Sequence, residues 1–204
     1  MSIYTMGIDV GSTASKSVIL KDGSEIVAKS LVAVGTGTSG PSRAIAQVLE
    51  NAGMTREQMD FVLATGYGRN SLDGLADMQM SELSCHARGA AFLFPNVRTV
   101  IDIGGQDVKV IEIENGMMKN FVMNDKCDIT HGIHKSVAGR VSGLCHRIGV
   151  RDDVVMTGGV AQNHGIVQAL REQLGHEIHT TPLTQYNGAL GAALFAYQKA
   201  LKKQ

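Results

Sequence analysis

The chain of 204 residues is poor in cysteine, proline and aromatic residues. It has three cysteines, three prolines and no tryptophan, and only 4% of its residues are aromatic. Three cysteines are too few, and odd in number, for a disulfide framework, so we expect a reducing compartment. No window approaches the roughly 18 consecutive apolar residues of a membrane span, and the N-terminus lacks a basic region followed by an apolar run. These absences predict a cytoplasmic protein that does not act at a membrane.

An excess of charge of one sign is missing as well. Nineteen Lys and Arg residues balance nineteen Asp and Glu residues, which gives a formal net charge of zero. Electrostatics therefore does not favour a nucleic acid as partner. The 24 glycines predict tight turns between strands, and the length suffices for one large domain or two small lobes, each with its own core.

A repeat organises the sequence. The stretch "GIDVGSTASKSVILKDGSEIV", which begins at Gly7, is repeated 93 residues later within "VIDIGGQDVKVIEIENGMMKN". The matched pairs are Asp9 and Asp102, Gly11 and Gly104, Lys16 and Lys109, and Gly23 and Gly116. Each copy predicts three strands joined by a small-residue turn and an Asp-Gly or Asn-Gly turn.

The repeat predicts an α/β fold with two lobes of similar topology. We place the lobes at residues 1–95 and 96–204, and the C-terminal helix could pack back on the first lobe. The alternative is a pair of unrelated hairpins.

Three glycine turns follow the ends of predicted strands, at Gly11-Ser12-Thr13, at Gly104-Gly105-Gln106 and at Gly158-Gly159. Glycine lets a phosphate approach backbone N–H groups that a side chain would cover. The two repeated Asp residues, Asp9 and Asp102, suit a hydrated Mg2+ or an attacking water. Lys16 and Lys109 either bind phosphate or are exposed. The turns match neither a P-loop nor a dinucleotide fingerprint.

Seven segments together resemble a known family. They are "GIDVGSTASKSVIL", "ATGYGRN", "SELSCHARGA", "VIDIGGQDVKVI", "MNDKC", "DVVMTGGVAQN" and "YNGALGAALFAY". In this order they resemble the ATP-dependent activators of 2-hydroxyacyl-CoA dehydratases and the related benzoyl-CoA reductase ATPase subunits, within the actin and sugar-kinase superfamily.

The resemblance implies a two-lobed actin-like ATPase fold, a duplicated ribonuclease-H-like unit, that clamps ATP or ADP with Mg2+. It places the first phosphate loop at Asp9–Thr13 and the second at Asp102–Asp107, where Gln106 and Asp107 would position water. The adenosine side would be lined by Gly158, Gly159, Gln162 and Asn163.

The resemblance also implies a homodimer that holds one [4Fe-4S] cluster and passes an electron to a dehydratase when ATP is hydrolysed. Cys127 in "NDKC" matches the first of two cysteine ligands in each subunit. The sequence then continues directly with "DITHGIHKSVAGRV", and the segment that carries the second ligand is missing. A dimer would supply two thiolates where a cubane cluster needs four. Since Cys85 and Cys145 lie on apolar helix faces, we predict that they are packing residues and that Cys127 is an orphaned ligand.

Three functional alternatives remain. The first is an activator that couples ATP hydrolysis to electron transfer. The second is a shortened nucleotide-binding core that keeps the ATP clamp without redox function, and the third is a small-molecule kinase. Hydrolysis should be slow, because the missing segment would close part of the second lobe over the site. His131 and His134 could also form a zinc site with Cys127, although such spacing is common on solvated faces.

Overall fold

A computed structural model describes residues 2–72, 74–124 and 134–203. The chain forms two compact units. The first comprises Met1–Cys85 and Tyr186–Gln204, and the second comprises His86–Gln185. The lobe boundaries predicted from the repeat, 1–95 and 96–204, stay a prediction.

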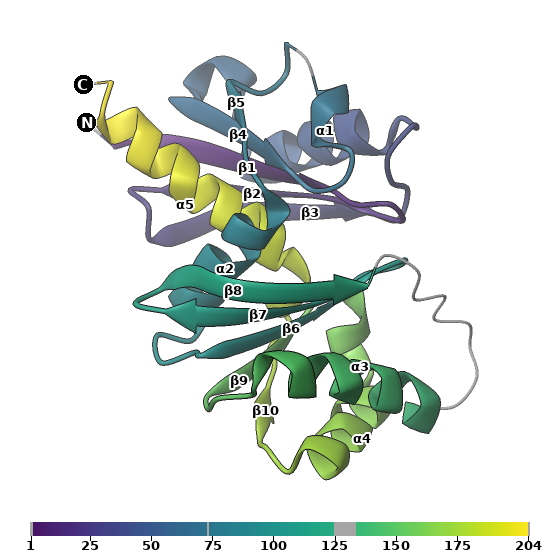
Figure 1. Ribbon diagram of the computed structural model, residues 1–204. Coiled ribbons are helices and arrows are strands. Elements are labelled where there is room, and N and C mark those ends of the chain that lie inside the picture. The colour runs from purple at the N-terminus through teal and green to yellow at the C-terminus, as the bar shows by residue number, and fades with distance from the viewer. Residues whose placement is uncertain (1, 73, 125–133, 204) are drawn as a thin grey trace. The chain divides into compact units, whose positions relative to one another are not determined.

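The first unit is built on a five-stranded sheet with the order β3-β2-β1-β4-β5 (Figure 1). The strands are β1 (Tyr4–Val10), β2 (Ser15–Lys21), β3 (Glu25–Val32), β4 (Phe61–Thr65) and β5 (Met78–Gln79). Strands β1 to β3 pair antiparallel, whereas β4 pairs parallel with β1 and β5 pairs parallel with β4. The antiparallel unit predicted for the first repeat is therefore confirmed.

Helices cover both faces of this sheet. On one face, α1 (Gly40–Ala52) packs against Ile8 and Val62, and on the other, α5 (Asn187–Leu201) packs against Phe61 and Leu63. Adjacent residues of β4 belong to different cores because side chains alternate along a strand. A side chain at Gly7 would overlap the backbone of α5, so this glycine is what lets the small-residue helix lie close to β1. The remaining short elements are η1 (Arg56–Gln58) and η2 (Arg69–Ser71).

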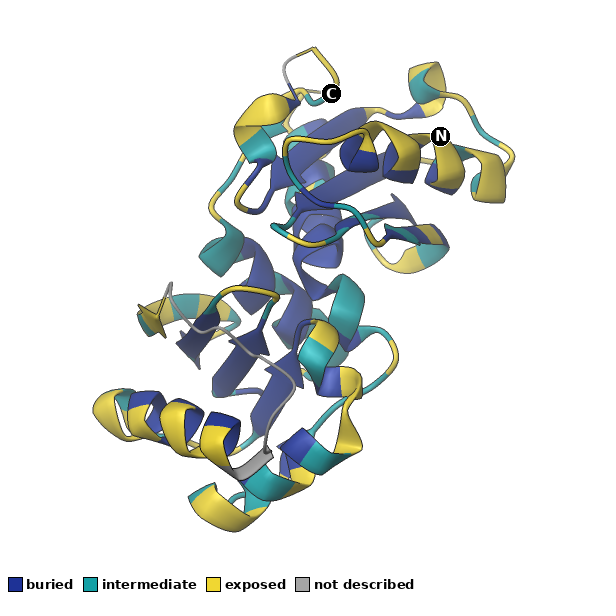
Figure 2. Cartoon of the chain, turned by 90° about the vertical axis from the view of Figure 1, so that its right-hand side faces the viewer, coloured by how far each residue is buried: buried dark blue, intermediate teal, exposed yellow. Residues whose placement is uncertain are grey.

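The second unit repeats this plan with the sheet order β10-β9-β6-β7-β8. Its strands are β6 (Thr99–Ile103), β7 (Val108–Glu114), β8 (Met117–Asn124), β9 (Val154–Thr157) and β10 (Ile178–His179). Helices α3 (His134–Ile148) and α4 (His164–Leu174) cover one face and enclose a core with Ile101, Ile103 and Val110. Figure 2 shows buried residues on the inner side of α3 and exposed residues on its outer side. Its other element is η3 (Gly159–Gln162), and α2 (Glu82–Leu93) and η4 (Thr184–Tyr186) each cross a boundary between the two units.

The two sheets match in detail beyond strand order. The β2–β3 turn has positive φ at Asp22 (52°) and Gly23 (66°), and the β7–β8 turn has it at Asn115 (53°) and Gly116 (72°). Both are the tight hairpin turns that the Asp-Gly and Asn-Gly pairs predict. The register also shifts at equivalent places, between Ile19 and Leu20 in one hairpin and between Glu112 and Ile113 in the other. Two unrelated hairpins would not share these irregularities.

Across the described ranges, no helix is long and apolar enough to span a membrane.

Candidate functional site

In the first unit, Asp9 lies near the end of β1, on the face of the sheet that α5 covers. Its carboxylate is almost fully buried, at 5% exposure, and its Oδ2 lies 3.4 Å from Nζ of Lys16. The two residues are direct partners across the β1–β2 pair. The turn that follows is closed by a hydrogen bond from Gly11 N–H to the Ala14 carbonyl (3.0 Å), with Ser12 half-buried and Thr13 exposed. A buried carboxylate thus lies beside a turn that is open to solvent.

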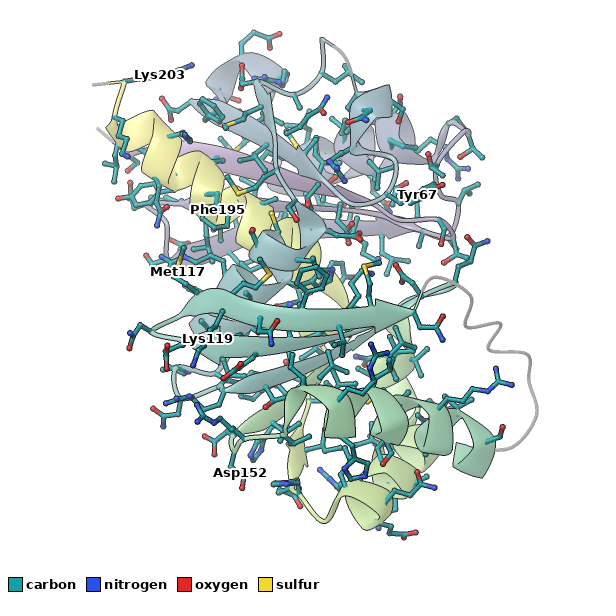
Figure 3. The ribbon with its side chains drawn as sticks, viewed as in Figure 1. Tyr67, Met117, Lys119, Asp152, Phe195 and Lys203 are labelled. Carbon is teal, nitrogen blue, oxygen red and sulfur yellow. The ribbon has the colours of Figure 1, made fainter. Side chains whose placement is uncertain are left out.

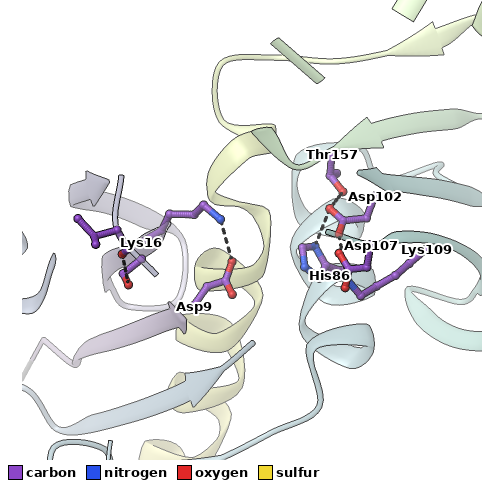
Figure 4. Close-up of polar contacts among 9 residues, drawn as sticks. Asp9, Lys16, His86, Asp102, Asp107, Lys109 and Thr157 are labelled. Atoms are coloured by element: carbon purple, nitrogen blue, oxygen red, sulfur yellow. Dashed lines mark hydrogen bonds and ion pairs between the residues drawn. The ribbon is translucent and has the colours of Figure 1, made fainter. Parts of the chain in front are cut away.

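In the second unit, the equivalent turn is built in the same way. Gly104 N–H donates to the Asp107 carbonyl (3.0 Å), and Asp102 pairs across the strands with Lys109. The Lys109 side chain is 3% exposed, and its ammonium lies 3.7 Å from Oδ2 of Asp102 and forms a close ion pair with Asp107. Gly105 and Gln106 are exposed at the tip of the turn. The sequence left open whether the two repeated lysines are simply exposed. Lys109 is buried and Lys16 is half-buried, and each is paired with its carboxylate (Figure 4).

Asp102 has two further neighbours that the sequence reasoning did not identify. Thr157 Oγ1 donates a hydrogen bond to Oδ1 of Asp102 (2.7 Å), and His86 Nδ1 lies 3.4 Å from the same oxygen. Thr157 ends β9 and His86 lies on α2. A Thr-Gly pair also ends the corresponding strand of the first unit, at Thr65-Gly66, and this second match between the halves could have revealed the threonine.

The third glycine turn leads from β9 into η3 and α4. Gly158 is buried with φ of 84°, and its N–H donates to the Thr184 carbonyl (3.3 Å). Gly159 and Gln162 are exposed. Asn163 caps α4, since its side-chain oxygen accepts hydrogen bonds from the N–H groups of Gly165 and Ile166. The four residues predicted for the adenosine side therefore lie in one continuous segment, and the Asn163 side chain already has a structural role.

The two described cysteines are not placed to be ligands of a four-thiolate cluster. Cys85 is fully buried among Phe61, Leu63 and the alanines of α5, and this burial, opposed in part by a hydrogen bond with Thr65, raises the pKa of its thiol to about 12. Burial in the α3–β-sheet core likewise raises the pKa of Cys145 to about 12. Iron ligation requires thiolates. Cys127 lies outside the described residues, so each chain offers at most this one candidate, and two copies offer two.

The predicted zinc alternative depends on residues that are also outside this description, because His131 and the side chain of His134 are not described. Within the part of the chain that is described, no three His, Cys, Asp or Glu side chains converge as a metal site. Carboxylate oxygens such as those of Asp9 and Asp102 are the ligands that Mg2+ takes, directly or through water. The chemistry of the two buried carboxylates therefore fits Mg2+, whereas the two described thiols do not fit an iron–sulfur cluster.

Comparisons with known proteins give close relatives. The chain is 58% identical to the (R)-2-hydroxyglutaryl-CoA dehydratase activating ATPase of Acidaminococcus fermentans, in an alignment that covers 99% of this chain and 100% of the relative. The crystal structure of component A of that dehydratase matches with a TM-score of 0.93 at 57% identity and covers 98% of this chain and 99% of its own. The activator of the 2-hydroxyisocaproyl-CoA dehydratase from Clostridium difficile, solved with bound ADPNP, matches with a TM-score of 0.94 at 42% identity and covers 99% and 97%.

The predicted gap after Cys127 is confirmed. The alignment to the Acidaminococcus protein extends over 260 positions, and this chain has 204 residues. At least 56 positions, the difference between these two numbers, thus have no counterpart here. The family model matches residues 6–127 and 128–196, so its match is interrupted at the predicted junction.

The two duplicated sheets and these neighbours establish the actin-like ATPase fold. Since the family model covers nearly the whole chain in two segments, this protein belongs to the BadF/BadG/BcrA/BcrD ATPase family.

Proposed function

We propose that this protein binds Mg-ATP and hydrolyses it, with the first glycine turn and the second glycine turn as its two phosphate loops. The observation that carries the proposal is the repeated pair of a buried carboxylate and its lysine beside an open turn, Asp9 with Lys16 and Asp102 with Lys109. The ADPNP in the Clostridium difficile relative supports a nucleotide as ligand.

Each part of the two turns has a role in this proposal. Backbone N–H groups of the turns bind phosphate oxygens. The residues that provide them are Ser12, Thr13 and Gly105, while the N–H groups of Gly11 and Gly104 close the two turns. Lys16 and Lys109 add positive charge next to the phosphates. Asp9 and Asp102 would hold Mg2+ through water, and the ion would neutralise charge at the phosphate oxygens. Gln106 and Asp107 orient the attacking water.

The nucleoside is assigned to the segment after β9. Gly159 is exposed and leaves its backbone open to a ligand, Gly158 lets the turn pass close to the Ile103 backbone, and Gln162 presents an exposed side chain. Asn163 contributes by holding the first turn of α4 in place, since its side-chain oxygen accepts two backbone hydrogen bonds there. We infer that the adenosine group of both ATP and ADP binds at this segment.

The relatives point to a dehydratase as the partner. Three of them are activators of dehydratases that act on hydroxyacyl-CoA substrates, by their names. We propose that this chain binds such an enzyme in a nucleotide-dependent manner, as a homodimer in a cytoplasmic setting. Slow hydrolysis is expected, because the additional segment of the relatives is missing next to the second turn.

The environments of the described cysteines favour a second candidate function, that of a nucleotide-binding core without an electron-transfer centre. Electron transfer through a cluster requires two cysteines from each chain. Here two of the three thiols are enclosed in separate cores. No step of the proposed hydrolysis depends on iron.

The test is release of phosphate from Mg-ATP by the wild-type protein and by Asp102→Asn. The substitution removes the negative charge and keeps the shape, so we expect the rate to fall by about tenfold or more. Asp152→Asn is a matched control, because Asp152 is an exposed carboxylate of the same unit that pairs with His176 (Figure 3). An Asp102→Asn protein as active as this control would contradict the assignment.

A further inference from the structure

The carboxylate of Asp102 is held by groups from three different elements. Its Oδ1 accepts the hydrogen bond of Thr157 from β9 and contacts His86 from α2, and its Oδ2 faces Lys109 from β7. Thr157 is fully buried, and the exposed fractions of Asp102 and His86 are 3% and 7%. Figure 4 shows the three side chains directed at the two carboxylate oxygens. Because the carboxylate is shielded from solvent, its orientation is set by these protein groups.

The sheet register creates this arrangement. Thr157, Asp102, Lys109 and Met123 are successive partners across β9, β6, β7 and β8. Partners in register project to the same side of the sheet at about 5 Å spacing. A hydroxyl at the last residue of β9 is thus within reach of the carboxylate on β6.

The first unit has the same row of residues but a different hydrogen bond. Thr65, Asp9 and Lys16 are partners across β4, β1 and β2. The hydroxyl of Thr65 donates to the Met80 carbonyl (3.0 Å), whereas Thr157 donates to the carboxylate. The hydroxyl groups of the two equivalent threonines therefore have different acceptors.

We propose that Thr157, together with His86, is a positioning residue that fixes the rotation of the Asp102 carboxylate for the Mg-ATP reaction. The inference rests on the proposed hydrolysis and deepens it. A carboxylate turns about its Cβ–Cγ bond unless one oxygen is held, and here the hydrogen bond from Thr157 and the close contact with His86 hold Oδ1. The direction in which Oδ2 would accept a hydrogen bond from a water molecule bound to Mg2+ is then fixed before the nucleotide arrives. Preorganised groups of this kind need no rearrangement during the reaction.

Thr157→Val tests the proposal, because valine keeps the shape of threonine and removes only the hydroxyl. We expect kcat for Mg-ATP to fall by about tenfold, the lower end of the range for residues that orient a metal-binding carboxylate, with KM changed less than threefold. Thr157→Ser keeps the hydroxyl and should restore most of kcat. Thr65→Val is the matched control from the first unit, since its hydroxyl serves a backbone carbonyl. It should retain the wild-type kcat.

Binding provides a readout that does not depend on turnover. We would measure the shift in melting temperature caused by ADP alone and by ADP with Mg2+. In Thr157→Val the shift due to ADP alone should remain, and the additional shift due to Mg2+ should shrink. His86→Leu should shrink it in the same direction, which covers the case in which the valine variant does not fold.

A double-mutant cycle distinguishes an effect through Asp102 from general damage. If Thr157 acts through Asp102, adding Thr157→Val to Asp102→Asn should cause no further loss of kcat. An additive loss would overturn the proposal, and so would a valine variant with wild-type kcat and Mg2+ response. If the wild-type protein neither hydrolyses ATP nor responds to Mg-ADP, the proposed function fails. If it responds to Mg-ADP without turnover, the Mg2+ shift alone decides the role of Thr157.

Discussion

The two described cysteines should resist alkylation in the folded protein. At pH 8, a thiol with the ordinary pKa of 9.0 is roughly one-tenth ionised, whereas a thiol with a pKa of about 12 is ionised to about one part in ten thousand. Because the thiolate is the reactive form, Cys85 and Cys145 should react about a thousandfold more slowly than an ordinary thiol, before any steric protection is counted. Mass spectrometry of peptides after timed labelling measures both rates, and labelling in guanidinium gives the unprotected reference. Rates in the folded protein equal to those in denaturant would refute the buried placement.

The same pKa shifts predict how stability depends on pH. The folded pKa of each thiol is raised above the unfolded value, so its contribution to stability is complete below pH 9. It is lost as the pH rises toward 12, because the unfolded state releases its protons first. Each thiol should lower the free energy of unfolding by about 1.4 kcal/mol per pH unit within this window. Cys85→Ala with Cys145→Ala lacks these groups, so the difference between its pH profile and that of the wild type isolates the effect. Parallel profiles would contradict it.

The repeat made the antiparallel half of each candidate site predictable from sequence. Asp9 and Lys16, and likewise Asp102 and Lys109, lie on adjacent strands joined by a short turn. In a hairpin the turn sets the register, so a match of residues between the two copies carries a match of contacts. The junction after Cys127 was predicted in a different way, from the family resemblance, because "NDKC" is not followed by the continuation that the family has.

Contacts between segments distant in sequence were not predictable in this way. Thr157 meets Asp102 across 55 residues through a parallel strand pair, and nothing local sets that register. The different hydrogen-bond acceptor of Thr65 is even harder to predict from the sequence, because it depends on where the Met80 carbonyl lies. The shared Thr-Gly pair marks both positions as equivalent, yet the backbone nearby decides what each hydroxyl binds.

Two further predictions concern iron and packing. After anaerobic incubation with iron and sulfide, the protein should bind far less than the two irons per chain that a shared four-iron cluster requires in a dimer, measured by iron content and visible absorption; a stoichiometric cluster would show that another donor set exists. Gly191→Ala should destabilise the protein by several kcal/mol, because the added carbon of α5 would overlap the backbone of Cys85 and neither backbone can give way. Gly143→Ala is the matched change in α3, where nothing lies within 4 Å of the added carbon. Since alanine favours a helix over glycine by about 1 kcal/mol, this variant should unfold at higher urea concentration than the wild type. Equal shifts for the two variants would mean that α5 does not lie as close to the Cys85 backbone as the structure places it.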